Sequence, residues 1–159
     1  MDTKTVKLYY DNDNLIIYKE FTEKNGVPEG EFKIYYENGL INTIGNYVNG
    51  KVVGKYERFY DNGKLLEICN YVNYILGEKE GEYKSFHDNG QLWIHCNFVN
   101  GKRHGEWKSY HKDGKICCVC NYIDGKAEGE CKEYDENNNL ICHYIYKDNK
   151  IIETLFEKN

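Results

Sequence analysis

The chain repeats itself with a nearly fixed period, and this repetition constrains its fold more than any other feature. The segment GEYKSFHDNGQL at 81–92 returns as GEWKSYHKDGKI at 105–116. Successive repeats are spaced by 24, 27, 24 and 24 residues, and they open at Gly30, Gly54, Gly81, Gly105 and Gly129. Units of this length bury their apolar face by stacking on neighbours. The sequence therefore predicts an array, which offers an extended surface more readily than a catalytic cavity.

Each repeat carries two tight-turn signals. With the opening glycine as position 0, positions 8 and 9 read Asn-Gly or Asp-Gly in four units, as in Asn38-Gly39. A second pair of this kind follows later in the unit, as in Asn49-Gly50. Such pairs favour a two-residue type I′ turn, because both central residues of that turn have positive φ. We therefore expect two short strands and two tight turns in each repeat.

The predicted fold is all-β: an elongated, single-layer antiparallel β-meander built from about six 24-residue hairpin repeats. We expect one domain over 1–159, with a degenerate N-terminal unit at 4–29, the five repeats, and a C-terminal edge strand at 150–156. Residues 8–15 of the degenerate unit are similar to 34–41. The extra segment Tyr74-Ile75-Leu76 accounts for the spacing of 27 and falls at a turn, where insertions cost least.

Symmetrical pairing about the first turn sets position 2 opposite position 15 and position 4 opposite position 13. One face is then aromatic in nearly every unit, whereas the other carries Glu at position 1 and Lys at position 3, which we interpret as a cross-strand charge ladder. The aromatic rows either hold the sheet together or also form a binding surface. The candidate binding residues are Tyr56, Tyr83, Trp107, Phe98 and Tyr122.

The cysteines are the sharpest chemical signal. Symmetrical pairing across the Asp124-Gly125 turn predicts Cys118 directly opposite Cys131, on the same face as Cys120 and Cys142. Four thiols in one patch are compatible with a zinc or soft-metal site, with a Cys118–Cys131 disulfide under oxidation, or with reduced structural thiols. We favour structural thiols, because side chains on a flat sheet converge poorly on a tetrahedron. We therefore predict no metal and no cofactor.

The segment NFVNGKRHGEW at 97–107 resembles a MORN repeat, and 46–56 and 121–130 fit the same outline. An added Tyr/Phe-x-x-Asn-Gly-x-Leu segment makes the chain similar to the variant MORN family, whose bacterial members are often labelled antitoxins. The resemblance covers nearly the whole chain. It implies an elongated antiparallel β-meander that acts as a scaffold or interaction module.

Composition excludes several classes of function. The net charge of −5 and the pI of about 5.6 give no electrostatic footprint for nucleic acid. The N-terminus lacks the apolar core of a signal peptide, and no apolar run is long enough to span a bilayer, so we expect a cytoplasmic protein with reduced cysteines. Repeat-equivalent histidines are too far apart to form a dyad, and no repeated acid completes a triad, so we expect no enzyme.

The expected function is a non-catalytic scaffold that binds an unidentified protein or a second copy of itself. An antitoxin-like inhibitor of a partner toxin is the alternative. A carbohydrate- or membrane-surface-binding array is a further alternative, although no basic patch favours a membrane.

Overall fold

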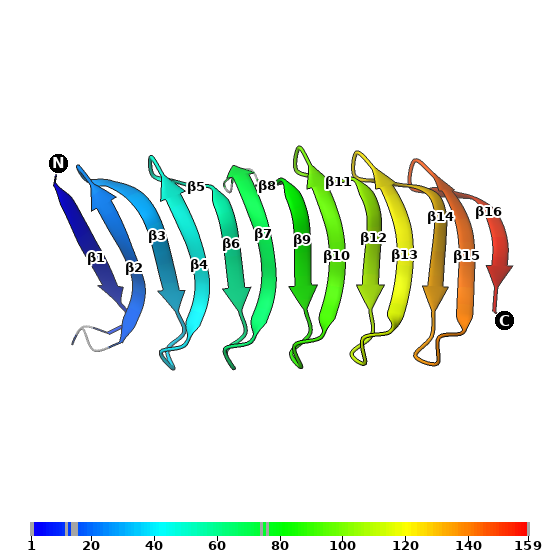
Figure 1. Cartoon of the computed structure of the whole chain (residues 1–159), viewed down its shortest axis with the longest axis horizontal. Helices are drawn as coiled ribbons and strands as arrows, with labels where there is room; N and C mark the ends of the chain where they lie inside the picture. The colour runs from blue at the N-terminus through cyan, green and yellow to red at the C-terminus, as the bar shows by residue number, and fades with distance from the viewer. Residues whose placement is uncertain (1, 12, 14–15, 74, 76, 159) are drawn as a thin grey trace. The chain divides into compact units, whose positions relative to one another are not determined.

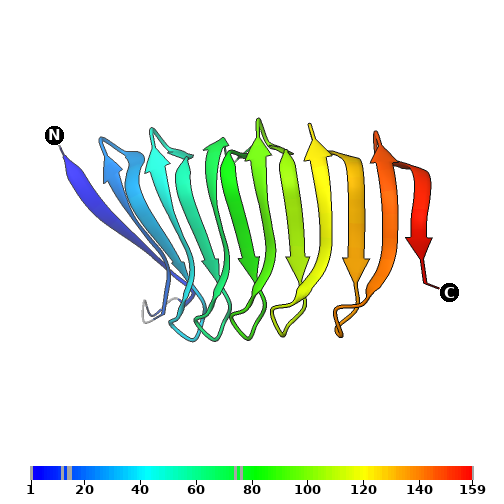
Figure 2. The ribbon, with the colours of Figure 1, turned by 45° about the vertical axis from the view of Figure 1, so that its right-hand side comes forward.

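The computed structural model describes residues 2–11, 13, 16–73, 75 and 77–158. The chain divides into two compact units, Met1–Lys79 and Glu80–Asn159. Each unit is an antiparallel meander in which consecutive strands pair in chain order (Figure 1). The strands of each unit lie side by side in a single layer (Figure 2).

In the first unit the hydrogen-bonded order is β1-β2-β3-β4-β6-β7, while the short strands β5 and β8 pair with β4 and β7. The strands are β1 (Thr3–Tyr9), β2 (Ile17–Lys24), β3 (Val27–Tyr35), β4 (Ile41–Val48), β5 (Lys51–Val52), β6 (Gly54–Phe59), β7 (Leu65–Asn73) and β8 (Glu78–Lys79). Parts of two sequence predictions, namely Asn12, Asn14 and Leu15 of the degenerate unit and Tyr74 and Leu76 of the insertion, lie outside the described residues.

In the second unit the order is β9-β10-β12-β13-β14-β15-β16, with the short strand β11 paired to β10. The strands are β9 (Gly81–Phe86), β10 (Leu92–Val99), β11 (Lys102–Arg103), β12 (Gly105–Tyr110), β13 (Ile116–Ile123), β14 (Lys126–Tyr134), β15 (Leu140–Lys147) and β16 (Lys150–Glu157). The predicted all-β antiparallel meander is thus confirmed within each unit, and β16 occupies the predicted edge strand. The expectation of a single domain stays a prediction.

The second turn has the predicted type I′ geometry in the first, third, fourth and fifth repeats, where both central residues have positive φ. Asn49 and Gly50 both have positive φ, at 51° and 75°, and Asp124 and Gly125 repeat this with 49° and 84°. Asparagine and aspartate tolerate the left-handed region better than other non-glycine residues, which explains the sequence pattern.

The prediction of type I′ geometry is wrong for the first turn. In the first repeat, Gly39 has positive φ, and its N–H donates to the Tyr36 carbonyl at 2.9 Å. The Tyr36 N–H in turn donates to the Leu40 carbonyl at 2.8 Å, so the loop contains three residues. The Asn38 side chain accepts the Leu40 N–H at 2.9 Å, which stabilises a type I turn followed by a glycine bulge.

A second irregularity lies at the opening glycine of a repeat. Between the pairs Tyr122↔Ala127 and Cys120↔Cys131, the register of β13 and β14 shifts by two residues, so that 128–130 oppose Asn121 alone. Gly129, in the middle of this bulge, has φ +77°, which an L side chain rarely adopts. The same shift of two residues occurs around Gly54, within 53–56, and around Gly105, within 104–107.

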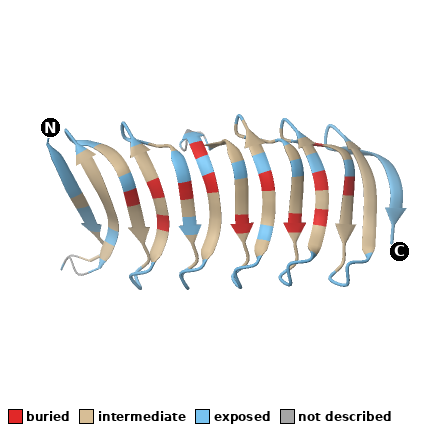
Figure 3. Cartoon of the chain, viewed as in Figure 1, coloured by how far each residue is buried: buried red, intermediate tan, exposed pale blue. Residues whose placement is uncertain are grey.

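The core is a band of aromatic rings over small residues, and buried positions lie both in the middle of the strands and near some of their ends (Figure 3). In the first unit, Phe32 and Tyr56 are 3% and 6% exposed and their rings lie over Gly45. A Cβ at Gly45 would stand 2.6 Å from the Phe32 ring and 3.3 Å from the Tyr56 ring. The equivalent positions of the next three repeats hold the small residues Cys69, Cys96 and Cys120.

Gly45→Ala is expected to destabilise the chain by about 1–3 kcal/mol, because the added methyl overpacks the space beneath the Phe32 ring. Urea unfolding followed by circular dichroism measures the change. Combining Gly45→Ala with Phe32→Leu should cost less than the sum of the two single changes, since the smaller side chain frees the space. Full additivity would contradict the proposed contact.

Hydrogen bonds at the rim connect the first turn of one repeat to the next repeat along the chain. The Tyr36 hydroxyl donates to the Phe59 carbonyl at 2.7 Å in the first unit. In the second unit, at the same repeat position, His111 Nε2 lies 2.9 Å from the Tyr134 carbonyl oxygen. A carbonyl only accepts, so Nε2 carries the hydrogen. Tyrosine and histidine thus perform the same task.

His111→Phe is expected to lower the free energy of unfolding by about 1 kcal/mol, because it removes this donor. His111→Tyr should retain more of the stability than His111→Phe, since Tyr36 makes the equivalent bond with its hydroxyl. Denaturant unfolding of both variants measures the difference. Equal losses in the two variants would show that the hydrogen bond contributes nothing.

Candidate functional site

The aromatic rows predicted from the repeat lie on one face within each unit. In the second unit the rings pair across neighbouring strands: Tyr83 and Phe98 have centroids 5.8 Å apart, and Trp107 and Tyr122 6.4 Å apart. Both pairs have edge-to-face geometry, which aromatic side chains prefer. The rings stabilise the sheet by these contacts and are held in defined orientations.

The five predicted binding residues differ in exposure. Tyr83, Phe98, Trp107 and Tyr122 are half-buried, so each presents part of its ring to solvent. Tyr56 belongs to the first unit and is buried, because it packs over Gly45 and edge-to-face on Tyr71 with centroids 5.2 Å apart. Tyr56 therefore offers little area to a partner. The surface considered below, called the aromatic face, consists of Tyr83, Phe98, Trp107 and Tyr122.

Arg103 adds a cation to the aromatic face. Its guanidinium carbon lies 4.4 Å from the centroid of the Tyr122 ring, and its backbone pairs with that of Phe98. A guanidinium over an aromatic ring is held by a cation–π interaction. Sequence analysis did not single out Arg103. Its place next to the Asn100-Gly101 hairpin was the signal that could have revealed it.

The opposite face carries ion pairs, but they differ from the predicted cross-strand ladder. Glu82 pairs with Lys84 at 2.8 Å, two residues further along the same strand. Its cross-strand partner is His95, whose Nε2 lies 2.9 Å from Glu82 Oε1. Hydrogen bonds from Lys84 and then from His95 lower the pKa of the Glu82 carboxyl. Glu130 has the same arrangement with Lys132 and His143, and its pKa is lowered as well.

Replacing Glu82 and Glu130 together by Gln is expected to lower the melting temperature slightly at pH 7. Both folded-state pKa values lie below the ordinary value of 4.5, so these carboxylates stabilise the fold above that pH. The stabilisation is lost as the pH falls through the folded-state pKa values. The difference between wild type and variant should therefore shrink in thermal melts as the pH is lowered below 4.5. A difference that stays constant through the acid range would contradict this assignment.

Thiol and imidazole groups occur next to each other at Cys96 and His95, but they do not form a catalytic pair. Successive residues of a strand point to opposite faces, so the ring of His95 lies on the charged face and the thiol of Cys96 on the aromatic face. The pairing of Cys96 with Tyr83 agrees with this placement. This pair therefore does not provide an activated nucleophile.

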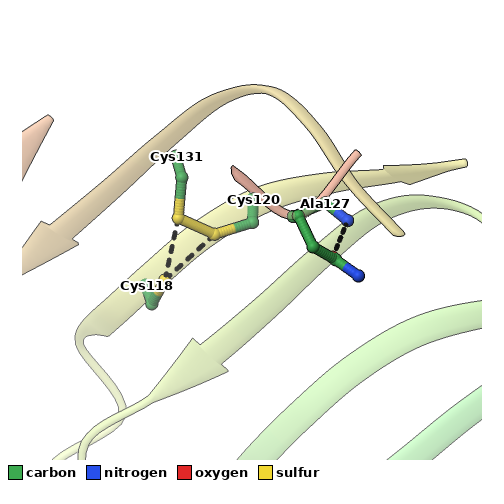
Figure 4. Close-up of a disulfide and its surroundings, with 5 residues drawn as sticks. Cys118, Cys120, Ala127 and Cys131 are labelled. Atoms are coloured by element: carbon green, nitrogen blue, oxygen red, sulfur yellow. Dashed lines mark hydrogen bonds between the residues drawn. A yellow bond between two sulfur atoms is a disulfide. The ribbon is translucent and has the colours of Figure 1, made fainter. Parts of the chain in front are cut away.

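Three cysteines of β13 and β14 converge in the second unit (Figure 4). Cys120 and Cys131 form a disulfide, with their Cα atoms 4.2 Å apart. The sulfur of Cys118 lies 3.5 Å from that of Cys120 and 3.8 Å from that of Cys131. All three side chains are buried, and they pack against the rings of Trp107, Tyr122 and Tyr146. We call Cys118, Cys120 and Cys131 the thiol cluster.

The structure corrects the predicted pairing of these cysteines. Cys118 pairs with Glu133 rather than with Cys131, and Cys131 instead faces Cys120. The reason is the two-residue bulge at Gly129, which symmetrical pairing about the turn does not anticipate. The expectation of reduced thiols is wrong for Cys120 and Cys131.

The remaining cysteines of this region lie outside the thiol cluster. Glu133 lies between Cys118 on β13 and Cys142 on β15, and its backbone pairs with both. The Cys142 sulfur accepts a hydrogen bond from the Tyr144 hydroxyl at 3.4 Å. Cys117 is a half-buried free thiol next to Cys118, on the opposite face of the strand. Burial, with a smaller contribution from the charge of Glu133, raises the pKa of the Cys118 thiol to about 12. Cys118 is therefore protonated at neutral pH.

Comparison with known families gives one match. The model described as MORN repeat variant matches five consecutive segments, which are 28–49, 52–73, 79–100, 103–124 and 127–148. No curated protein matches the chain. Within the described residues, no helix is long and apolar enough to cross a membrane.

Proposed function

The chain belongs to the MORN repeat variant family, and we propose that it is a non-catalytic scaffold that binds a protein partner through the aromatic face. Repeats of this family generally mediate interactions with proteins or membranes. A repeat fold of this all-β kind is typically not an enzyme. The observation that supports the proposal most is the partial exposure of Tyr83, Phe98, Trp107 and Tyr122.

The aromatic face has the properties of a binding surface with a few dominant residues. Tryptophan, tyrosine and arginine are the residues most enriched among those that contribute 2 kcal/mol or more to binding. The edge-to-face contacts already restrict the ring rotamers, so less side-chain entropy is lost on association. Arg103 adds a positive charge beside Tyr122. A fitting partner would insert apolar side chains between the rings and place a carboxylate near Arg103.

The partner is either a second copy of the chain or a different protein, and a measurement distinguishes self-association from binding to a different protein. Binding to itself would make the apparent mass depend on protein concentration, whereas binding to another protein would not. The antitoxin-like, carbohydrate-binding and membrane-surface roles stay predictions.

Replacing Trp107 and Tyr83 by Ala is expected to weaken binding to the partner at least tenfold, because it removes two anchor rings. The partner is first identified by affinity capture from the native cell and mass spectrometry, and its affinity for purified variants is then measured by calorimetry. If nothing is captured, light scattering over a range of concentrations tests self-association with the same variants.

Trp93→Ala is the matched control. Trp93 is the only other tryptophan of the chain, is 45% exposed, and lies at the bulge between Leu92 and Ile94, where its ring contacts His87 with centroids 5.6 Å apart. Its loss should leave binding unchanged. Undiminished binding by the folded Trp107→Ala, Tyr83→Ala variant would exclude the aromatic face as the interface.

A further inference from the structure

We propose that the thiol cluster, once its disulfide is reduced, is a binding site for a soft monovalent cation of the Cu(I) class. This inference is separate from the proposed scaffold function, because it concerns the buried sulfur atoms of Cys118, Cys120 and Cys131 rather than the solvent-facing parts of the aromatic face.

The geometry of the three sulfur atoms suits a three-coordinate ion. Metal–sulfur bonds of about 2.3 Å place three sulfurs around a trigonal ion about 4.0 Å from one another. The sulfur of Cys118 already lies 3.5 Å and 3.8 Å from its two neighbours. The largest change needed is the separation of the Cys120 and Cys131 sulfurs, which breaking their covalent bond permits. The backbone therefore holds the three ligands close to the required arrangement before any ion binds.

The cluster arises where the chain departs from its own repeat pattern. Position 2 of a repeat holds an aromatic ring in the first four repeats, namely Phe32, Tyr56, Tyr83 and Trp107. The fifth repeat has Cys131 there, and the bulge at Gly129 sets it opposite Cys120. Cys118 is two residues before Cys120 on β13 and points to the same face. The array by itself would have placed a ring at this position, so the convergence of thiols is specific to β13 and β14.

The donor set favours Cu(I) over zinc. Soft thiolates select Cu(I), zinc or iron–sulfur clusters, and structural zinc takes four ligands. Among the described residues, the potential ligand atoms that lie close enough together to share a metal ion are three sulfurs, with no imidazole or carboxylate. The ligands are 4–9% exposed, and the rings of Trp107, Tyr122 and Tyr146 pack against them. This apolar surround restricts water, the ligand that would complete a zinc site with three protein ligands.

The disulfide makes the site dependent on redox state. A dithiol reductant supplies two electrons and two protons: the bond between Cys120 and Cys131 breaks, each sulfur becomes a thiol, and the reductant becomes a disulfide. Cation binding then replaces the thiol protons, which pass to solvent. The oxidised protein retains one free thiol of the three, at Cys118, and lacks the site.

The test is a competition for Cu(I). The full chain is reduced with a dithiol, and the reductant is removed under anaerobic conditions. The reduced chain is then titrated into the coloured Cu(I) complex of bicinchoninate. One equivalent of Cu(I) should pass to the reduced chain, and the disulfide form should take up none. Cys118→Ser should weaken the transfer at least tenfold. A hydroxyl fits at this repeat position, since Thr43 is buried at the equivalent place in the first repeat, so the variant should fold.

Cys117→Ser is the matched control, because Cys117 adjoins Cys118 in sequence but points to the other face. It should leave the transfer unchanged. In a Trp93→Phe background, Cu(I) should also quench the fluorescence of Trp107, which packs against the cluster. The proposal is overturned if the reduced chain takes up no Cu(I), if folded Cys118→Ser binds as well as wild type, or if equimolar Zn(II) displaces the ion.

Discussion

The pairing of backbone between successive hairpins is the interaction on which the rest of the structure depends. Each unit is a single layer, so its aromatic side chains are packed mainly by their own row and by the small residues beneath them. Hydrogen bonds at the rims, such as that from His111 to the Tyr134 carbonyl, connect a turn to the following repeat. At the other rim, the Glu29 carboxylate accepts the N–H of Asn49 at 2.8 Å and connects neighbouring hairpins in the same way. Backbone hydrogen bonds between strands and side-chain hydrogen bonds at the two rims thus stabilise each unit without a second layer.

This architecture explains why the candidate function lies in a surface. Rings that pack only along a row remain partly exposed, as Trp107 and Tyr122 do, and such rings contribute to structure and to binding at once. The thiol cluster arises from the same single-layer packing, because a position that holds a ring in other repeats holds a buried sulfur here. Where Cys131 replaces the aromatic ring of the repeat, the space beside Cys120 is filled by sulfur and enclosed by the neighbouring rings. Two departures from the repeat, Cys131 in place of a ring and Cys118 in place of Thr43, Glu67 or Ile94, therefore change packing positions into a site with chemistry of its own.

Much of the fold was predictable, since Asn-Gly pairs and alternating side chains are local signals. The type I′ prediction is correct at Asn49-Gly50 and wrong at Asn38-Gly39, because there the Asn38 side chain caps the loop and keeps its own φ negative. The same dipeptide thus forms two different turns, and the hydrogen bonds of the flanking strands decide between them. The burial of Tyr56 was not predictable either, because it depends on Gly45, which lies on the neighbouring strand β4.

By itself, the sequence determined the repeat, the all-β class, and the face on which the three cysteines of the thiol cluster lie. It determined these because a period of 24 residues and an alternation of two are properties of the chain alone. Only the tertiary structure decided which residues meet. The bulge at Gly129 shifts the register by two residues, and a shift of two preserves the face while it changes the partner. Cys118, Cys120 and Cys131 were therefore placed correctly on one face, yet the disulfide joins Cys131 to Cys120 and leaves Cys118 as the third sulfur.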